Sequence, residues 1–391
     1  MPGSYRHIVI CTVLCLCSLF GKGQEFKKAN DFTYQLYQQE KWDSLIIVGD
    51  SIISSGLDFY YLRLRVGLAH YFKKQYLLAI PHFQEAVLMN EAENIAAEHL
   101  YYCYFQSGQY LQALKVISKQ NNYVQQKVGF NKKKYVQSGQ LRAGYKSSNS
   151  EYIPAARELD ADVDIKLLKS SNLKLSINQI IQRASFWDIK QRQLYLGYSL
   201  PLKQDWNIHL GFSALSYDYN VKPLGTTILT EGNQWVGSIA LDKFYLNNQI
   251  HFGMTILNGD STNHHQLSLG YTYFPKGNSS LFAGLSLYGS VEENLSDFAL
   301  AFKPYFGFKL GQKTTFDFSY LKGGGHNLVF LNGELVNNNY DITSGLLEAG
   351  VGYQWHPKWS MSLFYNLEFK QNDLINDYHY NSLFINLKFT P

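Results

Sequence analysis

Charged side chains in the C-terminal part of the sequence recur at every second position. Asp160, Asp162 and Asp164 are two residues apart, and Arg142 and Lys146 lie on the preceding segment. Because residues i, i+2 and i+4 of a β-strand share one face, the pattern predicts an acidic row beside two basic side chains. Rings of opposite charge can select a polar solute in a pore. Further charges are expected on the same face: Lys166, Asp242, Lys303, Lys309, Asp317, Glu348, Glu368 and Lys388.

These charges have two interpretations. They could form a charged constriction for a polar solute or polysaccharide, or they could form salt bridges and hydrogen bonds that fill the interior of the protein. The number of strands expected below does not decide between the two, since it lies between filled eight-stranded barrels and open sixteen-stranded ones.

Enzymatic chemistry is a third possibility. One histidine of the His264-His265 pair could activate Ser268, but the sequence places no third group to orient it. The sequence has no Gly-x-Ser-x-Gly, His-Glu-x-x-His or phosphate-loop motif. His209 and His251 are expected to be hydrogen-bonding side chains of the interior, with no spacing that predicts a metal. The sequence therefore predicts no catalytic residue, metal or cofactor.

The sequence elements that would position these charges begin at Tyr135. From there on, apolar and polar residues alternate with a period of two, as in β-strands. Apolar and polar residues alternate over 346–355, 358–369 and 380–389; the polar phase is rich in Gly, Ser, Asn and Gln, and the apolar phase ends in aromatic residues. This is typical of a membrane barrel wall rather than of a soluble sandwich. About 14 strands are predicted: 136–146, 158–168, 172–182, 191–202, 205–217, 234–244, 248–257, 265–274, 280–290, 297–310, 314–321, 345–355, 358–369 and 380–389.

The predicted connections between strands alternate strictly between short and long. Segments 169–172 and 246–248 are short, whereas 147–157, 218–233 and 323–343 are long. An even number of antiparallel strands with this alternation is typical of a bacterial outer-membrane barrel, whose short turns face the periplasm.

The composition agrees with a strand-built membrane protein. Of the 391 residues, 16% are aromatic and only 17% are charged, against about 25% charged in a soluble domain. No apolar run of 18 residues occurs, which excludes a bundle of membrane helices. A formal net charge of +4 without a concentrated basic face does not favour nucleic-acid binding.

The N-terminus is expected to be a secretory signal peptide over 1–23. Arg6 and His7 precede the apolar stretch Ile8–Phe20, and small residues precede a cut after Gly23. Three of the four cysteines would leave with this segment, and their preceding residues do not suit a lipid anchor. Only Cys103 would remain, so no internal disulfide is expected.

Residues 24–120 contain an internal repeat. Trp42, Tyr76 and Tyr110 are spaced by 34 residues, which is the length of a tetratricopeptide repeat. The residues expected to pack its helices are Trp42, Gly67, Tyr76, Ala79, Phe83, Ala86, Tyr104, Gly108, Tyr110 and Ala113. The segment resembles the tetratricopeptide-repeat family, with two good units and a degenerate first one. The resemblance implies a concave face for a periplasmic protein or peptide; a spacer or a lid on the next domain is the alternative.

Residues 121–134 separate the repeat from the strands. Lys127 and Lys132 to Lys134 give this segment four positive charges and no acid. It is interpreted as a basic linker, and contact with anionic lipid or lipopolysaccharide is the alternative.

The whole chain, with its strand domain at 135–391, resembles Gram-negative outer-membrane proteins that combine periplasmic tetratricopeptide repeats with a β-barrel, such as YaiO-like barrels and exopolysaccharide-export porins. The resemblance implies a fold of α plus β type, with a short helical array before an antiparallel barrel in the outer membrane. It implies a channel or export pore for a polar solute or polysaccharide, in contact with outer-membrane lipid or lipopolysaccharide. A non-conducting anchor for the repeats is the alternative.

Overall fold

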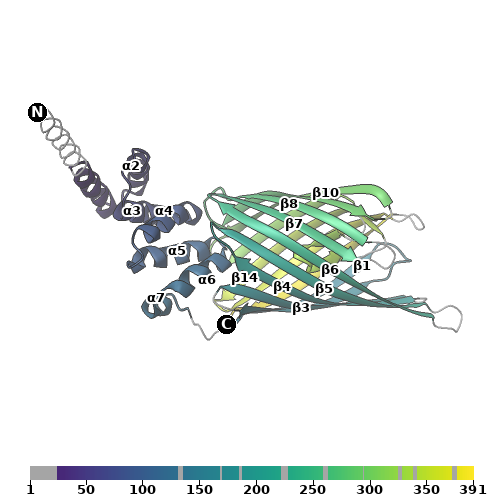
Figure 1. The fold of residues 1–391 in the computed structure, drawn as a ribbon. Coiled ribbons are helices and arrows are strands. Elements are labelled where there is room, and N and C mark those ends of the chain that lie inside the picture. Colours follow the sequence, from purple (N-terminus) through teal and green to yellow (C-terminus); the bar gives the residue numbers. More distant parts are fainter. Residues whose placement is uncertain are drawn as a thin grey trace, which may run out of the picture.

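The computed structural model describes residues 24–130, 135–167, 170–184, 187–221, 228–258, 263–293, 295–324, 328–337, 341–371 and 377–391. The expected signal peptide, 1–23, and Lys132 to Lys134 lie outside these residues. Helices come first and a closed barrel follows (Figure 1). No helix in the described ranges is long and apolar enough to cross a membrane.

The N-terminal region is an array of helices in which each packs against the next in sequence. A helix over 24–38 begins it. The helices that follow are α2 (Trp42–Ser54), α3 (Tyr60–Phe72), α4 (Tyr76–Met89), α5 (Asn94–Gln106), α6 (Tyr110–Lys119) and α7 (Asn122–Lys127). Residues in the left-handed backbone conformation, such as Gly108 with φ 82°, end helices and allow the chain to reverse direction.

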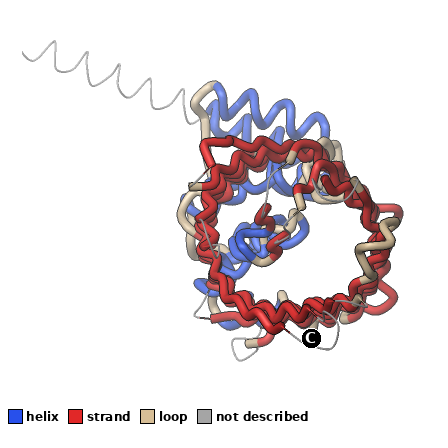
Figure 2. The backbone as a smooth tube through the Cα atoms, turned by 90° about the vertical axis from the view of Figure 1, so that its right-hand side faces the viewer, coloured by secondary structure: helices blue, strands red, loops and turns tan. Residues whose placement is uncertain are grey.

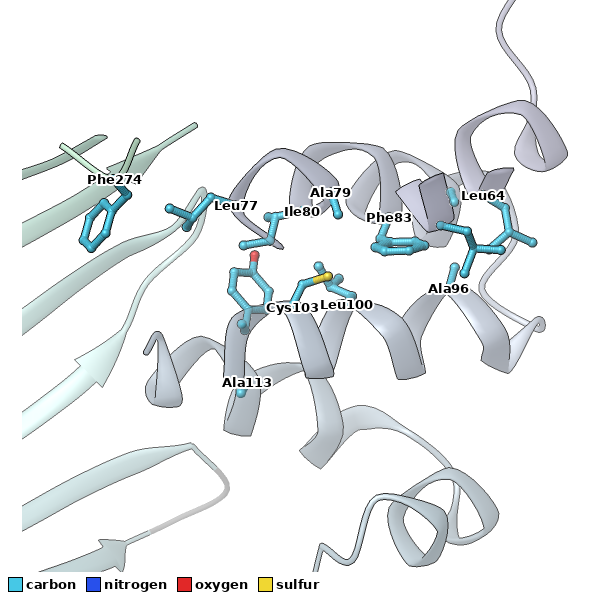
Figure 3. Close-up of a cluster of buried hydrophobic side chains, with 13 residues drawn as sticks. Leu64, Leu77, Ala79, Ile80, Phe83, Ala96, Leu100, Cys103, Ala113 and Phe274 are labelled. Carbon is cyan, nitrogen blue, oxygen red and sulfur yellow. The ribbon is translucent and has the colours of Figure 1, made fainter. Parts of the chain in front are cut away.

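Aliphatic, small and aromatic side chains make the core of this array (Figure 3). Phe83 of α4 is fully buried, and the ring lies against Gly67 of α3, where an added Cβ would come within 2.8 Å of it. Ala79 and Ala86 are also fully buried, one helical turn on either side of Phe83. Close approach of α3 and α4 therefore depends on glycine and alanine at the contact.

The other residues expected to pack the helices have different degrees of burial. Tyr104 and Ala113 are buried, and Trp42 stacks on Phe72 with ring centroids 4.9 Å apart. Tyr110 is exposed, because the single short helix α7, rather than another helical pair, follows α6.

The segment expected to be a linker begins with a helix. The Asn121 side chain accepts a hydrogen bond from the Val124 backbone N–H and caps α7. Gln125 donates to the carbonyl oxygens of Ile117 and Gln120, which fixes α7 on α6. Lys127 pairs with Glu98 of α5, and this hydrogen bond raises the pKa of the lysine. Residues 121–130 are therefore folded onto the array.

A buried histidine of α4 has a lowered pKa. The His82 ring stacks on His70 at 5.5 Å between centroids, and Arg63 lies 3.5 Å from its Nδ1. Burial, followed by the nearby His70 and Arg63, lowers the pKa of His82 from 6.5 to about 3. Asp58 and Asp50 are the acids nearby, and neither offsets the burial.

We expect the free energy of unfolding of the array to fall as the pH drops from 6.5 towards 3. In this range His82 is protonated in the unfolded state but stays neutral in the folded state. The raised pKa of Asp50 acts in the opposite direction, but this group is half exposed and its effect is smaller. Urea unfolding followed by helical circular dichroism at several pH values measures the slope. The His82→Gln variant should reduce the slope and leave the part that comes from His70, whose pKa is also lowered by burial; an unchanged slope would contradict the assignment.

The C-terminal region is a closed antiparallel barrel of 14 strands, which confirms the predicted fold class and strand number. The strands are β1 (Val136–Ser148), β2 (Ala156–Leu167), β3 (Ser171–Arg183), β4 (Trp187–Pro201), β5 (Trp206–Val221), β6 (Ile228–Tyr245), β7 (Asn248–Asn258), β8 (Asn263–Tyr273), β9 (Leu281–Glu292), β10 (Leu295–Leu310), β11 (Thr314–Gly323), β14 (Ile342–His356), β15 (Trp359–Gln371) and β16 (Tyr378–Phe389). Pairing of β1 with β16 closes the ring and removes free edges.

The outer wall of the barrel is apolar. Large apolar side chains alternate along the strands and are exposed, among them Leu141, Ile177, Leu210, Met254, Leu269, Leu300 and Ile385. Aromatic side chains are exposed near both rims: Trp206, Tyr245, Tyr273, Trp355 and Trp359 at the end next to the helices, and Tyr145, Trp235, Phe298 and Phe369 at the other. An apolar band between two aromatic girdles is the outer surface of a transmembrane barrel.

The connections do not alternate in length as strictly as predicted. At the end away from the helices, 184–186 and 293–294 are short. At the end next to the helices, 274–280 is long, because it contacts the array: Gly277 accepts a hydrogen bond of 2.8 Å from the Leu77 N–H, and Asn278 donates to the Lys74 carbonyl at 2.7 Å. Phe274 completes the helical core (Figure 3).

A second contact joins the array to the turn between β4 and β5. The Tyr104 hydroxyl donates to Asp205 Oδ1 at 2.5 Å, and Gln84 Nε2 lies 3.1 Å from both oxygens of the same carboxylate. Gln112 donates to the Trp206 carbonyl at 2.9 Å. The helices are therefore fixed to one rim of the barrel through partly buried polar contacts and the shared apolar core.

Candidate functional site in the barrel lumen

Residues 328–337, which lie between β11 and β14 in the sequence, pack inside the barrel (Figure 2). They form the inserted hairpin, Leu328–Asn337, which consists of β12 (Leu328–Phe330), the short helix η1 (Leu331–Gly333) and β13 (Leu335–Asn337). Gly323 ends β11 with φ 101°, and an added Cβ there would lie 2.2 Å from the Leu300 carbonyl oxygen, so only glycine fits this bend.

The tip of the inserted hairpin is held by side chains from the far wall. Ser213 of β5 donates to the Gly333 carbonyl at 2.7 Å, and Gln193 of β4 donates to the Glu334 carbonyl at 2.9 Å. Ser238 of β6 donates to the Asn332 carbonyl. Counted round the ring, β4 is seven strands from β11, so the hairpin crosses the lumen.

Two apolar clusters hold the body of the hairpin. Val329 and Val336 pack with Leu215, Val236 and Leu257 of the inner wall. On the other side, Leu328 and Phe330 pack with Ala301 and Leu321. Gln266 of β8 forms two hydrogen bonds with the Val329 backbone, 2.6 Å to its oxygen and 3.1 Å to its nitrogen. Burial of these side chains inside the barrel gives the hairpin a fixed position.

Charged contacts also connect the hairpin to the wall. Lys174 of β3 pairs with Glu334 at 2.5 Å, and Lys303 of β10 lies over the Phe330 ring at 5.4 Å. The described contacts of the hairpin are thus concentrated on β3–β11. The facing arc of wall, β14–β16 with β1 and β2, carries most of the charges predicted from the sequence.

On that arc the acidic row lies beside the basic pair. Arg142 Nη2 lies 2.9 Å from both Glu158 Oε1 and Asp160 Oδ2, and Lys146 lies 3.4 Å from Glu158 Oε2. The side chains of Arg142 and Lys146 are each 25% exposed within the lumen. Further along β2, Asp162 follows on the same face, and Asp164 accepts hydrogen bonds from Ser138 and Asn172.

The remaining predicted charges fall into separate places. Glu348 pairs with Lys303, and Glu368 pairs with a fully buried Lys370 at 2.8 Å. Asp317 lines a cavity of about 330 Å³ between Phe282, Tyr288, Tyr305 and Phe364. Three lie towards the rim next to the helices: Lys166 lies over the Phe130 ring, Lys309 contacts Ser279, and Lys388 is exposed.

The structure does not bring Ser268 to the histidine pair that was considered as its possible base. Ser268 does not meet the His264-His265 pair: His264 lies 3.9 Å from Glu292, and His265 is exposed on the outer face. The histidine next to Ser268 is His251, whose Nε2 lies 3.4 Å from Ser268 Oγ. The reason is the strand geometry, since Ser268 and His264 lie two pleats apart on β8 while His251 lies on the adjoining β7.

Sequence reasoning missed the inserted hairpin and its partners. A turn signal was present, because Asn332-Gly333 stands between two short apolar runs and both residues adopt positive φ, 57° and 94°. Glu158, Lys174, Glu334 and Lys370 were also missed, although Glu158 lies two residues from Asp160 and Lys370 two residues from Glu368 on the same strand.

A closed antiparallel barrel with an apolar outer wall and a polar, partly occupied interior defines a membrane-spanning β-barrel. No family model matches the sequence, and no curated protein matches it.

Solved structures with a similar fold include the CymD monoaromatic hydrocarbon channel, with 7% identity over 67% of this chain and 90% of that one and a TM-score of 0.45. The Ralstonia pickettii toluene transporter TbuX has 8% identity over 66% of this chain and 90% of that one, with a TM-score of 0.43. The Acinetobacter baumannii outer membrane protein Omp33 has 12% identity over 66% of this chain and 99% of that one, with a TM-score of 0.39. At these identities the likeness concerns the fold of the barrel alone.

Proposed function

We propose that the protein is a channel of the Gram-negative outer membrane for a small polar solute. The observation that carries the proposal is the division of the lumen. The inserted hairpin occupies the centre and packs on β3–β11, while water reaches the charged side chains of Arg142 and Lys146 on the facing arc. A lumen with charges of both signs beside a fixed constriction suits selective passage.

A small solute fits this lumen better than a polysaccharide does. The hairpin crosses the barrel and is bonded to the opposite wall by Gln193, Ser213 and Ser238, so a polymer chain would have to displace it. At the rim next to the helices, the array also lies behind part of the opening (Figure 2). Both features favour a narrow path and a small solute.

We place the helical array in the periplasm, because short turns of outer-membrane barrels face that side and most turns at this rim are short. The repeat spacing favours a tetratricopeptide-like array that docks a periplasmic protein or peptide. Exposed Tyr61, Leu88 and Tyr123 leave apolar surface on the array for such a partner. The remaining candidate function is a non-conducting anchor for the array, which the Lys370–Glu368 pair and similar closed contacts would suit.

Single-channel recording in planar bilayers tests the channel. The wild type should conduct, and Arg142→Gln should shift the reversal potential towards cation selectivity, because Glu158 and Asp160 lose their shared cation. Arg192→Gln is the matched control, since that side chain is 48% exposed on the outer face and pairs with Asp218. If no preparation of folded protein conducted ions, the result would favour the non-conducting anchor instead.

A further inference from the structure

A row of polar side chains crosses five neighbouring strands of the inner wall, near the rim that carries the helices. Ser199 Oγ lies 2.8 Å from His209 Nδ1, and His209 Nε2 lies 2.9 Å from Asp242 Oδ2. The other oxygen, Asp242 Oδ1, lies 2.8 Å from His251 Nδ1, and His251 Nε2 lies 3.4 Å from Ser268 Oγ. Passage of a solute through the lumen requires none of these contacts.

One half of this row has the order of a nucleophile, a base and an orienting acid. When the Nδ1 proton of His251 is donated to Asp242, the lone pair of Nε2 faces the Ser268 hydroxyl. The carboxylate then fixes the tautomer of the imidazole and stabilises its charged form. The distance of 3.4 Å to the serine is typical of a relaxed nucleophile–base pair before a substrate binds.

Glycine at one position brings the serine and the histidine together. Gly253 is the cross-strand partner of Ser268, and it lies between the two side chains on the inner wall. An added Cβ at Gly253 would lie 2.4 Å from Ser268 Oγ and 3.1 Å from His251 Nε2. Any larger residue would therefore separate the pair.

Ser268 is partly exposed on the inner wall, one strand away from the residues that line the cavity of about 330 Å³. The His251 side chain is 29% exposed. Tyr288 and Ser286, which line the cavity, pair with Ser268 and Gly270 on the adjoining strand, and adjoining strands are about 4.8 Å apart. The aromatic lining, with Lys303 and Glu348 at one side, suits a small ester with an aromatic or short acyl group.

We propose that Ser268, His251 and Asp242 form an esterase site in the lumen. Ser268 Oγ attacks the ester carbonyl carbon while its proton passes to His251 Nε2. The carbon–oxygen bond to the alcohol then breaks, and the alcohol leaves with that proton. Water, deprotonated by the same nitrogen, releases the acid and regenerates the serine. Backbone N–H groups of a closed barrel are committed to strand pairing, so no backbone oxyanion hole assists; activated esters are therefore the preferred substrates.

Labelling of the purified full-length protein with a fluorophosphonate, together with hydrolysis of p-nitrophenyl acetate, tests the proposal. The wild type should be labelled at Ser268, as located by mass spectrometry. Ser268→Ala should abolish labelling, and Asp242→Asn should slow it by about tenfold or more, because the imidazole loses its orienting acid. Ser362→Ala, at an inward position on β15, should be labelled like the wild type.

Three outcomes would overturn the proposal: no label above background, a label that persists in Ser268→Ala, or a label located at Ser199. Heat-modifiable mobility of the barrel in gels shows that each variant is folded. Conductance recorded on the same preparations separates the two proposals, because a conducting protein without a label disproves only the esterase, and a labelled protein without conductance disproves only the channel.

Discussion

Replacement of the inserted hairpin, 328–337, by a short Gly-Ser linker should raise the single-channel conductance several-fold. The hairpin fills the centre of the lumen, and its removal leaves the ring of 14 strands and their backbone pairing unchanged. Leu215, Val236 and Leu257 would then face water, so the barrel should also unfold at a lower temperature. Planar-bilayer recording and thermal shift of the gel mobility measure the two effects.

The same linker in place of 149–155, the connection between β1 and β2 at the same rim, is the control. No described residue of that connection packs with the apolar clusters of the lumen, so the conductance should stay near that of the wild type. An unchanged conductance after removal of the hairpin would mean that the hairpin does not define the narrowest part of the path.

Phe83→Ala should destabilise the helical array by about 3–5 kcal/mol, because the ring is fully buried and its loss leaves a cavity between α3 and α4. Gly67 offers no side chain to fill the space. Urea unfolding followed by helical circular dichroism measures the change, while gel mobility reports the barrel separately.

Leu88→Ala on the same helix is the matched control, since Leu88 is 70% exposed; its effect should stay within about 0.5 kcal/mol. If Phe83→Ala cost no more than this control, the ring would not be the core residue that its burial indicates. Unfolding of the barrel together with the array would show that their shared core, which includes Phe274, couples the two.

The strands were predictable because each has one face towards lipid and one towards the interior, and this requirement imposes a period of two on the sequence. Every predicted strand matches an observed one, with ends that differ by a few residues. Arg142 and Asp160 could be expected near each other, since consecutive antiparallel strands place them in register. The helical segment at 122–127 was missed because six residues are too few to show a period.

The inserted hairpin could not be predicted from periodicity. Its two strands have three residues each, and its stability comes from Gln193, Ser213 and Leu257, which are distant in the sequence. The same reason applies to the contact of Asp242 with both His209 and His251, which depends on the register of β5, β6 and β7. The sequence contains the type of each side chain, but the register of strand pairing determines which side chains are in contact.

The crossing of the lumen by the hairpin has a mechanical consequence. Lipids press on a barrel from all sides, and its resistance to flattening depends on strand pairing and on the packing of the inward side chains. Because the hairpin leaves the wall at β11 and is bonded at β4 and β5, it braces two opposite walls as a strut. The cross-section is therefore stiff along this diameter and more compliant at right angles to it, across the arc that carries Arg142 and Lys146.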